Sequence, residues 1–213
     1  MSDPIPEAIS LLNEHHRAFS AAKPLADKTG HTVPSDTKSF SEILVSLLTG
    51  LRGRTRRKGS DLSDGSDVKA ASVWSAIDTP RFNGCAPAGR VSDTAKKPND
   101  VSALDDMPFM FFVLWDGGDD GRPRCRVWCV RPRSDREFRR MVATWYAKRE
   151  AGEIKSTNFQ LHPPRNREDN VIRNSCGNLE YPLLFRAEMR GGTYEVVHFD
   201  PTVLVDGECR LST

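Results

Sequence analysis

The chain has 213 residues, 38% of them hydrophobic, and a formal net charge of +2, which is enough for one domain with a sizeable core. No run approaches the roughly 20 apolar residues of a membrane helix, and the N-terminus lacks a signal peptide's basic and apolar segments, so we expect a cytoplasmic protein with no membrane partner. The five cysteines are scattered without zinc-site spacing, which favours reduced structural thiols.

The N-terminal part of the chain predicts two helices. Residues 5–19 place apolar side chains at i+3 and i+4 steps, which is typical of an amphipathic helix. Residues 20–38, with two prolines and a glycine, indicate a connector. A second helix is expected from Ser39, because Ser39 and Glu42 form a capping box. Its apolar stripe, centred near Leu47, should pack on a sheet.

A basic run then leads into an acidic cluster. Residues 52–58 carry five Lys or Arg, and such a run forms either a solvated face or a phosphate-binding surface. Two short strands are expected near 58–63 and 66–74, with Asp64-Gly65 as the hairpin turn between them.

The remainder of the chain predicts a mixed sheet. Met107 to Trp115 is apolar almost without interruption, which is typical of a central strand buried on both faces. The further elements expected are a returning strand at 124–131, a helix from Ser134 to near 152, a strand at 156–162, a helix at 181–190 and a strand at 194–199. The first three strands should be antiparallel neighbours. This order predicts an α/β protein with a mixed central β-sheet flanked by helices.

The acidic cluster Lys58-Gly-Ser-Asp-Leu-Ser-Asp-Gly-Ser-Asp-Val-Lys-Ala70 is typical of a metal-dependent nuclease. Asp67 and Lys69 should share a face, because strand residues i and i+2 do. Mg²⁺ binds one or two carboxylates and keeps waters for a substrate phosphate, and a lysine beside it can orient or deprotonate a water. Asp61, Asp64 and Asp67 are therefore candidate metal ligands. Because Gly, Ser and Asp also gather in ordinary turns, a turn without metal stays open.

At Asp61-Leu-Ser-Asp-Gly-Ser-Asp67-Val-Lys69 the chain resembles the PD-(D/E)xK nuclease superfamily, in the compact form of mismatch-repair nicking enzymes and several restriction endonucleases. The resemblance implies that Asp61 is the first acid and that Asp67 and Lys69 are the D-x-K pair, all three catalytic. Asp64 is the alternative first acid, and Ser60 stands where the superfamily usually has proline.

The superfamily often adds a catalytic glutamate from the preceding helix, and Glu42 is the candidate. Its capping-box position and its helical angle, opposite the stripe centred near Leu47, favour a structural role instead.

Two later blocks, Asn158-Phe-Gln-Leu-His-Pro-Pro-Arg165 and Cys176-Gly-Asn-Leu-Glu-Tyr-Pro182, resemble MamI-type type II restriction endonucleases. The resemblance implies a restriction-endonuclease-like core and a homodimer that uses Mg²⁺ to cut both strands of an interrupted palindromic site in double-stranded DNA. Residues 39–155 would form the nuclease core and 1–38 an N-terminal helix and connector. Residues 156–213 would be a C-terminal part of the same domain, with recognition and dimer elements.

Candidate DNA-binding residues fall into two groups. One edge of the 156–162 strand and the loop after it carries possible base readers, because Asn and Gln pair with adenine and Arg with guanine; they are Asn158, Gln160, His162 and Arg165. A solvated edge strand is the alternative. In the basic run, Arg54, Arg56 and Arg57 would hold phosphates without reading sequence.

The sequence thus predicts a Mg²⁺-dependent, sequence-specific endodeoxyribonuclease. Two alternatives stay open: a repair nuclease that nicks one strand, and a non-catalytic DNA-binding protein whose Asp/Gly/Ser run is only a turn.

Overall fold

The computed structural model describes residues 3–29, 37–54, 59–74, 76, 79–87, 100–118, 120–164 and 169–205. The α-helices are α1 (Ile5–Thr29), α2 (Thr37–Thr49) and α3 (Arg136–Glu150), and the 3₁₀ helices are η1 (Val101–Leu104) and η2 (Pro201–Leu204). The strands are β1 (Asp67–Ser72), β2 (Met110–Gly117), β3 (Pro123–Val130), β4 (Val171–Asn174), β5 (Gly177–Glu180), β6 (Leu183–Arg190) and β7 (Thr193–Phe199). Among these residues, no helix is both long and apolar enough to cross a membrane.

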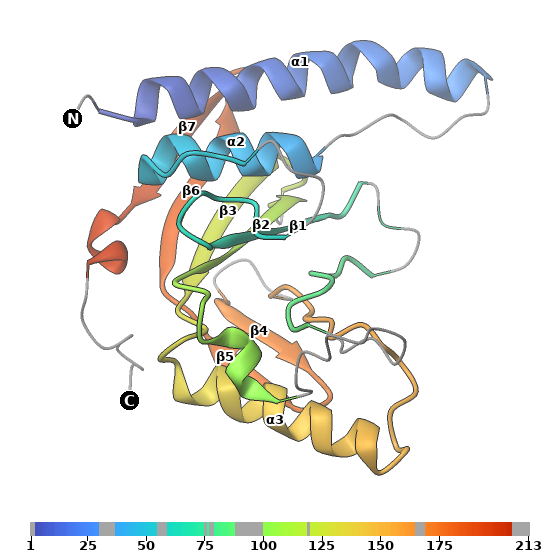
Figure 1. The fold of residues 1–213 in the computed structure, drawn as a ribbon. Coiled ribbons are helices and arrows are strands. Elements are labelled where there is room, and N and C mark those ends of the chain that lie inside the picture. Colours follow the sequence, from blue (N-terminus) through green and yellow to red (C-terminus); the bar gives the residue numbers. More distant parts are fainter. Residues whose placement is uncertain are drawn as a thin grey trace.

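A five-stranded sheet in the order β1-β2-β3-β6-β7 forms the centre of the molecule. Helices α1 and α2 lie on one face, and α3 with the β4–β5 hairpin lies on the other (Figure 1). β1 runs parallel to β2, while the other neighbours are antiparallel. This mixed sheet with helices on both faces confirms the predicted α/β class.

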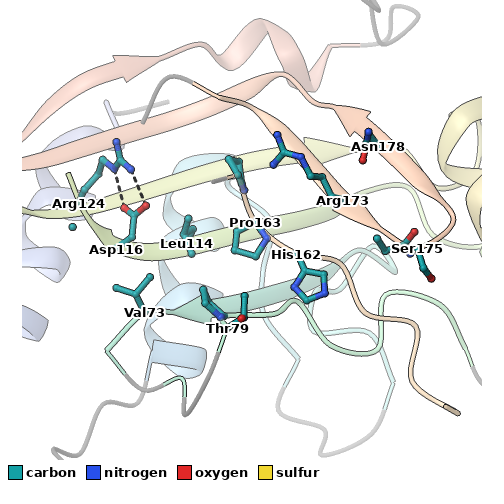
Figure 2. Close-up of a pocket in the computed structure, with 14 residues that line it drawn as sticks. Val73, Thr79, Leu114, Asp116, Arg124, His162, Pro163, Arg173, Ser175 and Asn178 are labelled. Carbon is teal, nitrogen blue, oxygen red and sulfur yellow. Dashed lines mark hydrogen bonds and ion pairs between the residues drawn. The ribbon is translucent and has the colours of Figure 1, made fainter. Parts of the chain in front are cut away.

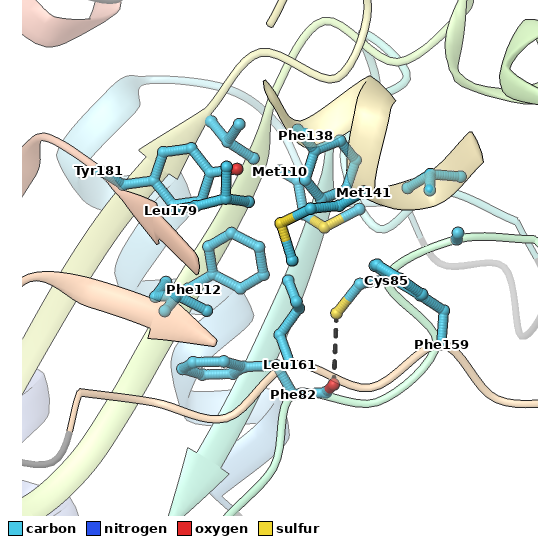
Figure 3. Close-up of a cluster of buried hydrophobic side chains, with 14 of the residues drawn as sticks. Phe82, Cys85, Met110, Phe112, Phe138, Met141, Phe159, Leu161, Leu179 and Tyr181 are labelled. Atoms are coloured by element: carbon cyan, nitrogen blue, oxygen red, sulfur yellow. Dashed lines mark hydrogen bonds between the residues drawn. The ribbon is translucent and has the colours of Figure 1, made fainter. Parts of the chain in front are cut away.

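Strand β2 is buried on both faces, as its apolar run predicts. Phe111 and Trp115 pack toward α1 and α2, and the Trp115 indole donates to Ser41 Oγ at 2.8 Å. On the other face, Phe112 joins the apolar cluster that includes Met141 of α3 and the loop around 82–85 (Figure 3). Burying a Phe side chain contributes about 1.5–3 kcal/mol, so these two layers fix the sheet on which the site is built.

The cysteines behave as expected in the described part of the chain. Those it contains are all buried and free of disulfides: Cys85, Cys125, Cys129 and Cys176. The prediction of reduced structural thiols is confirmed for them, and Cys209 lies outside the described residues.

The prediction that the first three strands are antiparallel neighbours is wrong. Residues 59–66 form a loop held by a single bridge between Gly53 and Leu62, and β1 pairs in parallel with β2. A parallel pair needs a long crossover connection, and residues 73–109 supply it; among those that the structure describes there, η1 is the only helix or strand. Only β2 and β3 form the expected antiparallel pair.

Three other element boundaries differ from expectation. α1 continues through Pro24 to Thr29, because the Ala, Lys and Leu residues beside Pro24 are strong helix formers that offset its cost. Residues 183–190 form β6 in place of the expected helix at 181–190, since pairing with β3 and β7 overrides local propensity. Residues 156–162 make only isolated bridges, Phe82 to Leu161 and His162 to Arg173.

Candidate active site

Strand β1 presents Asp67 and Lys69 on the same face. Val68, between them, is buried against the α1–α2 layer, so its neighbours face the other way. Lys69 Nζ lies 2.6 Å from Asp67 Oδ2, and both side chains are largely buried, with 18% and 12% of their surfaces exposed. The predicted shared face of this pair is confirmed.

The loop before β1 brings Asp61 to the pair. Leu62 is fully buried, and backbone hydrogen bonds from Arg54 N to Asp61 O and from Leu62 N to Ser66 O hold the loop at 2.8 and 3.0 Å. Asp61 Oδ2 accepts from Val68 N at 3.0 Å. This contact fixes Asp61 beside the N-terminal end of β1, next to Asp67.

Asp64 shapes the turn and does not join this group. Its two carboxylate oxygens accept from Ser66 N at 2.9 Å and from Ser66 Oγ at 2.8 Å. Gly65 has φ +101°, and a Cβ there would lie 2.8 Å from Asp106 O, so the turn requires glycine. Of the two candidates for the first acid, the structure therefore brings Asp61, and not Asp64, to Asp67.

Glu42 lies at the same cleft, contrary to its expected direction. α2 begins at Thr37, so Ser39 is not its cap, and the buried face is centred on Leu44 and Leu48. This rotation turns Glu42 to the flank of the helix, where it lines a cleft of about 430 Å³ together with Asp61, Asp67 and Lys69. Glu42 also pairs with Lys38 at 3.4 Å.

The carboxylates of the cleft influence one another strongly. The pKa of Asp61 is raised to about 7, mainly by burial and next by its hydrogen bond with Asp67. Burial opposes ionisation of Asp67, but the hydrogen bond with Asp61 and the charge of Lys69 together hold the pKa of Asp67 below its ordinary value. The pKa of Lys69 is raised, because Asp67 outweighs the effect of burial. At neutral pH Asp61 is therefore only partly ionised, while Asp67 carries its charge beside Lys69.

This donor set fits a hard divalent cation. Mg²⁺ takes oxygen ligands and commonly only one or two carboxylates, and the adjacent Asp61 and Asp67 can supply them. Within the ranges that the structure describes, no group of three or more acidic, His or Cys side chains is arranged to hold a metal. The predicted three-aspartate set is therefore reduced to this pair, with Glu42 at the rim.

A second loop, Phe82–Cys85, borders the cleft next to Lys69. Gly84 has φ +67°, and a Cβ there would lie 3.9 Å from Lys69 Nζ. Asn83 lines the cleft next to Lys69 and is bonded to both Asn158 and Gln160. Sequence reasoning missed Asn83, whose only signal is the Asn-Gly pair of an ordinary turn.

The predicted DNA-binding residues separate into different places. Asn158 and Gln160 lie at the Asn83 loop, next to the cleft. His162 lies farther away, in a cavity of about 710 Å³ that also contains Arg173 and Asn178 (Figure 2). Arg54 lines the cleft and donates to Ser63 O at 3.0 Å. The remaining candidates, Arg56, Arg57 and Arg165, lie outside the described residues.

Comparisons with known proteins identify the family of the chain. The family model for MamI restriction endonuclease matches residues 24–192. The Type II restriction enzyme MamI of Microbacterium ammoniaphilum is 34% identical over 173 residues, which cover 76% of this chain and 54% of that protein. The chain thus spans about half the length of this relative, and no solved structure gives a significant match. With a family match over most of its length, the chain belongs to the MamI restriction endonuclease family.

Proposed function

We propose that this protein is a type II restriction endonuclease that hydrolyses double-stranded DNA at a specific sequence and depends on Mg²⁺. The observation that carries the proposal is the meeting of Asp61, Asp67 and Lys69 in one cleft, in a chain of this family.

Asp61 and Asp67 would hold the metal ion. Their carboxylates are adjacent, and a cation bound there would favour the ionised form of Asp61, whose pKa is raised mainly by burial and next by its hydrogen bond with Asp67. When bound, Mg²⁺ supplies a Lewis acid for the phosphate oxygens and a source of activated water.

Lys69 has the geometry to act on the substrate. Its ammonium group, 2.6 Å from Asp67 Oδ2, is a fixed positive charge beside the proposed metal ligands. From there it can position the attacking water and contact the scissile phosphate. Glu42, at the rim of the cleft, would orient a water on the side facing α2.

DNA would reach the cleft through its basic border. Arg54 lines the cleft, and the run at 52–58 carries five Lys or Arg, which suits contact with phosphates on both sides of the scissile bond. Because one cleft cuts one strand, we propose that a homodimer supplies the second, with 156–213 contributing recognition and dimer contacts.

The direct test is digestion of a plasmid of known sequence with the purified protein in Mg²⁺, followed by mapping of the ends. We expect linear product from a plasmid with one site, fixed ends, and no reaction when EDTA replaces the metal. Nicked circles alone would support a single-strand repair nuclease, and intact DNA with retained binding would support a non-catalytic DNA-binding protein.

A further inference from the structure

A cluster of three side-chain amides lies beside the catalytic cleft. The cleft continues past Ala70 into a second hollow of about 340 Å³, and Asn83 lines both. Gln160 lines the second hollow, and Asn158 bonds to the Asn83 loop from beneath. The cluster thus borders the second hollow, through which a DNA strand bound at Lys69 would continue.

The hydrogen bonds fix the direction of every amide. Gly84 N donates to Asn158 Oδ1 at 2.7 Å, and since a backbone N–H can only donate, Asn158 must present its oxygen there. Asn158 Nδ2 then donates to Asn83 Oδ1 at 3.2 Å, and Gln160 Nε2 donates to the same oxygen at 2.9 Å. Asn83 Oδ1 is therefore occupied by two donors.

This arrangement leaves the amide nitrogen of Asn83 and the amide oxygen of Gln160 free for a ligand, besides the second N–H of Gln160. Asn83 Nδ2 and Gln160 Oε1 make no hydrogen bond to any described residue, and both side chains are at least partly exposed. A phosphate offers acceptors alone, whereas the major-groove edge of adenine offers the N6 donor and the N7 acceptor. The donor of Asn83 and the acceptor of Gln160, which line the same hollow, therefore match adenine better than they match the backbone.

The cluster is held rigidly, as a reading surface must be. Phe82 and Leu161 exchange backbone hydrogen bonds of 2.8 and 3.0 Å, and Cys85 N donates to Phe159 O at 3.0 Å. Phe82, Phe159 and Leu161 are fully buried. Their packing anchors both segments that carry the amides, which lowers the entropy cost of binding a base.

We propose that Asn83 and Gln160 together read an adenine close to the scissile phosphate, and that Asn158 is a positioning residue that orients Asn83. The assignment rests on the proposed nuclease function. It changes the role of Asn158, whose amide is already used within the protein, and adds Asn83 as a specificity residue. Because the Asn83 loop lies next to Lys69 and base pairs stack about 3.4 Å apart, the adenine read should fall within a few base pairs of the cut.

The test uses the full chain and the cleavage site mapped for the wild type. Duplexes carrying each single base-pair substitution are cleaved by the wild type, Asn83→Ala, Asn83→Asp, Asn158→Ala and a control, Ser20→Ala, at an exposed position of α1. Asn83→Asp keeps the oxygen that accepts from Asn158 and Gln160 but replaces the outward donor, so it preserves the cluster while removing its reading edge.

We expect both Asn83 variants to lose about 10- to 100-fold of the discrimination, measured as a ratio of kcat/KM values, at one A·T position near the cut. Asn158→Ala should lose less at the same position, and Ser20→Ala should match the wild type. The assignment would be overturned if both Asn83 variants kept the wild-type discrimination at every position. It would also be overturned if they lost the same activity on every duplex. A wild type that cuts no DNA would overturn the proposed function, and the assignment with it.

Discussion

Two buried carboxylates, at opposite ends of the parallel β1–β2 pair, have different charge environments. Asp116, in β2, accepts from Arg124 Nε and Arg124 Nη2 at 2.8 Å each, and from Arg126 Nη2 at 2.8 Å. Asp67, in β1, has one lysine and a second aspartate beside it. The first group has more positive than negative charge, and both carboxylate oxygens of Asp116 accept hydrogen bonds from arginine. In the second, two carboxylates lie beside one buried lysine and Asp61 keeps its proton up to about pH 7, so a cation could take the place of that proton.

The comparison teaches that burial of a carboxylate alone does not mark a functional site. Asp116 and Asp67 are 6% and 9% exposed, yet one ties two strands together and the other is proposed to take part in chemistry. The balance of charge around each distinguishes them, and it leads to the following expectations.

Removing Asp116 should cause the largest loss of stability. Asp116→Ala leaves Arg124 and Arg126, which are 3% and 2% exposed, without their shared carboxylate, so the free energy of unfolding should fall by about 3–5 kcal/mol. Asp120→Ala is the matched control, because its ion pair with Arg122 is exposed and its loss should have a far smaller effect. Chemical denaturation measures both. Equal effects would contradict the structural role given to Asp116.

Asp67→Asn should lower the rate of DNA cleavage and leave the free energy of unfolding largely unchanged. Loss of this carboxylate should lower kcat/KM for DNA cleavage in Mg²⁺ by about 10²- to 10³-fold, comparable with removal of one preorganised electrostatic contact. Asp64→Asn is the control within the same cluster, since an asparagine oxygen can still accept from Ser66 N and maintain the turn. Activity retained in Asp67→Asn, or lost equally in Asp64→Asn, would remove the distinction between ligand and turn.

Asp61 should make stability fall as pH rises. Its pKa is about 7 in the folded protein against an ordinary 3.8, so the folded state holds a proton that the unfolded chain releases between these values. Relative to Asp61→Asn, the metal-free wild type should lose about 1 kcal/mol of unfolding free energy from pH 4 to pH 7, a figure reduced for solvent screening of a half-exposed group. Thermal denaturation at both pH values, repeated with Mg²⁺ to recover the loss, checks this. If the wild type and Asp61→Asn lost the same unfolding free energy between the two pH values, folding would not raise the pKa of Asp61.

The smallest effect is expected at the border of the cleft. Arg54→Ala should weaken DNA binding about equally for all sequences and reduce the slope of log affinity against log salt by about 1. Arg17→Ala, on an exposed part of α1 and paired with Glu14, is the control and should leave the slope unchanged. Titrations in Ca²⁺ at several salt concentrations measure the slope. A sequence-dependent loss in Arg54→Ala would mean that it reads a base.

Local patterns predicted the centre of the site but not its surroundings. The shared face of Asp67 and Lys69 follows from strand alternation, and the Asp64-Gly65 turn follows from residue type. Glu42 was expected to point away from the stripe near Leu47, but α2 starts two residues earlier than Ser39 and packs through Leu44 and Leu48. The orientation of a helix on a sheet depends on tertiary packing, which periodicity alone cannot fix.

The largest error concerned long-range pairing. The parallel pairing of β1 with β2 depends on the path of 73–109, which has little periodicity to analyse. Similarly, residues 183–190 form a strand, β6, because they pair with β3 and β7. The bridge between Phe82 and Leu161 brings Asn83 to Gln160. Each of these contacts joins segments far apart in sequence, where residue spacing carries no signal.

The assignment of this cleft as the active site is tested most directly by Lys69→Ala. Its DNA binding and cleavage are compared with those of Lys28→Ala, at the exposed end of α1. In Ca²⁺, both variants should bind the wild-type site with affinities within a few-fold of the wild type, about 1 kcal/mol at most. In Mg²⁺, Lys28→Ala should cut normally, while Lys69→Ala should be slower by at least about 10²-fold. Cleavage by Lys69→Ala at the wild-type rate would contradict the assignment of this cleft as the active site.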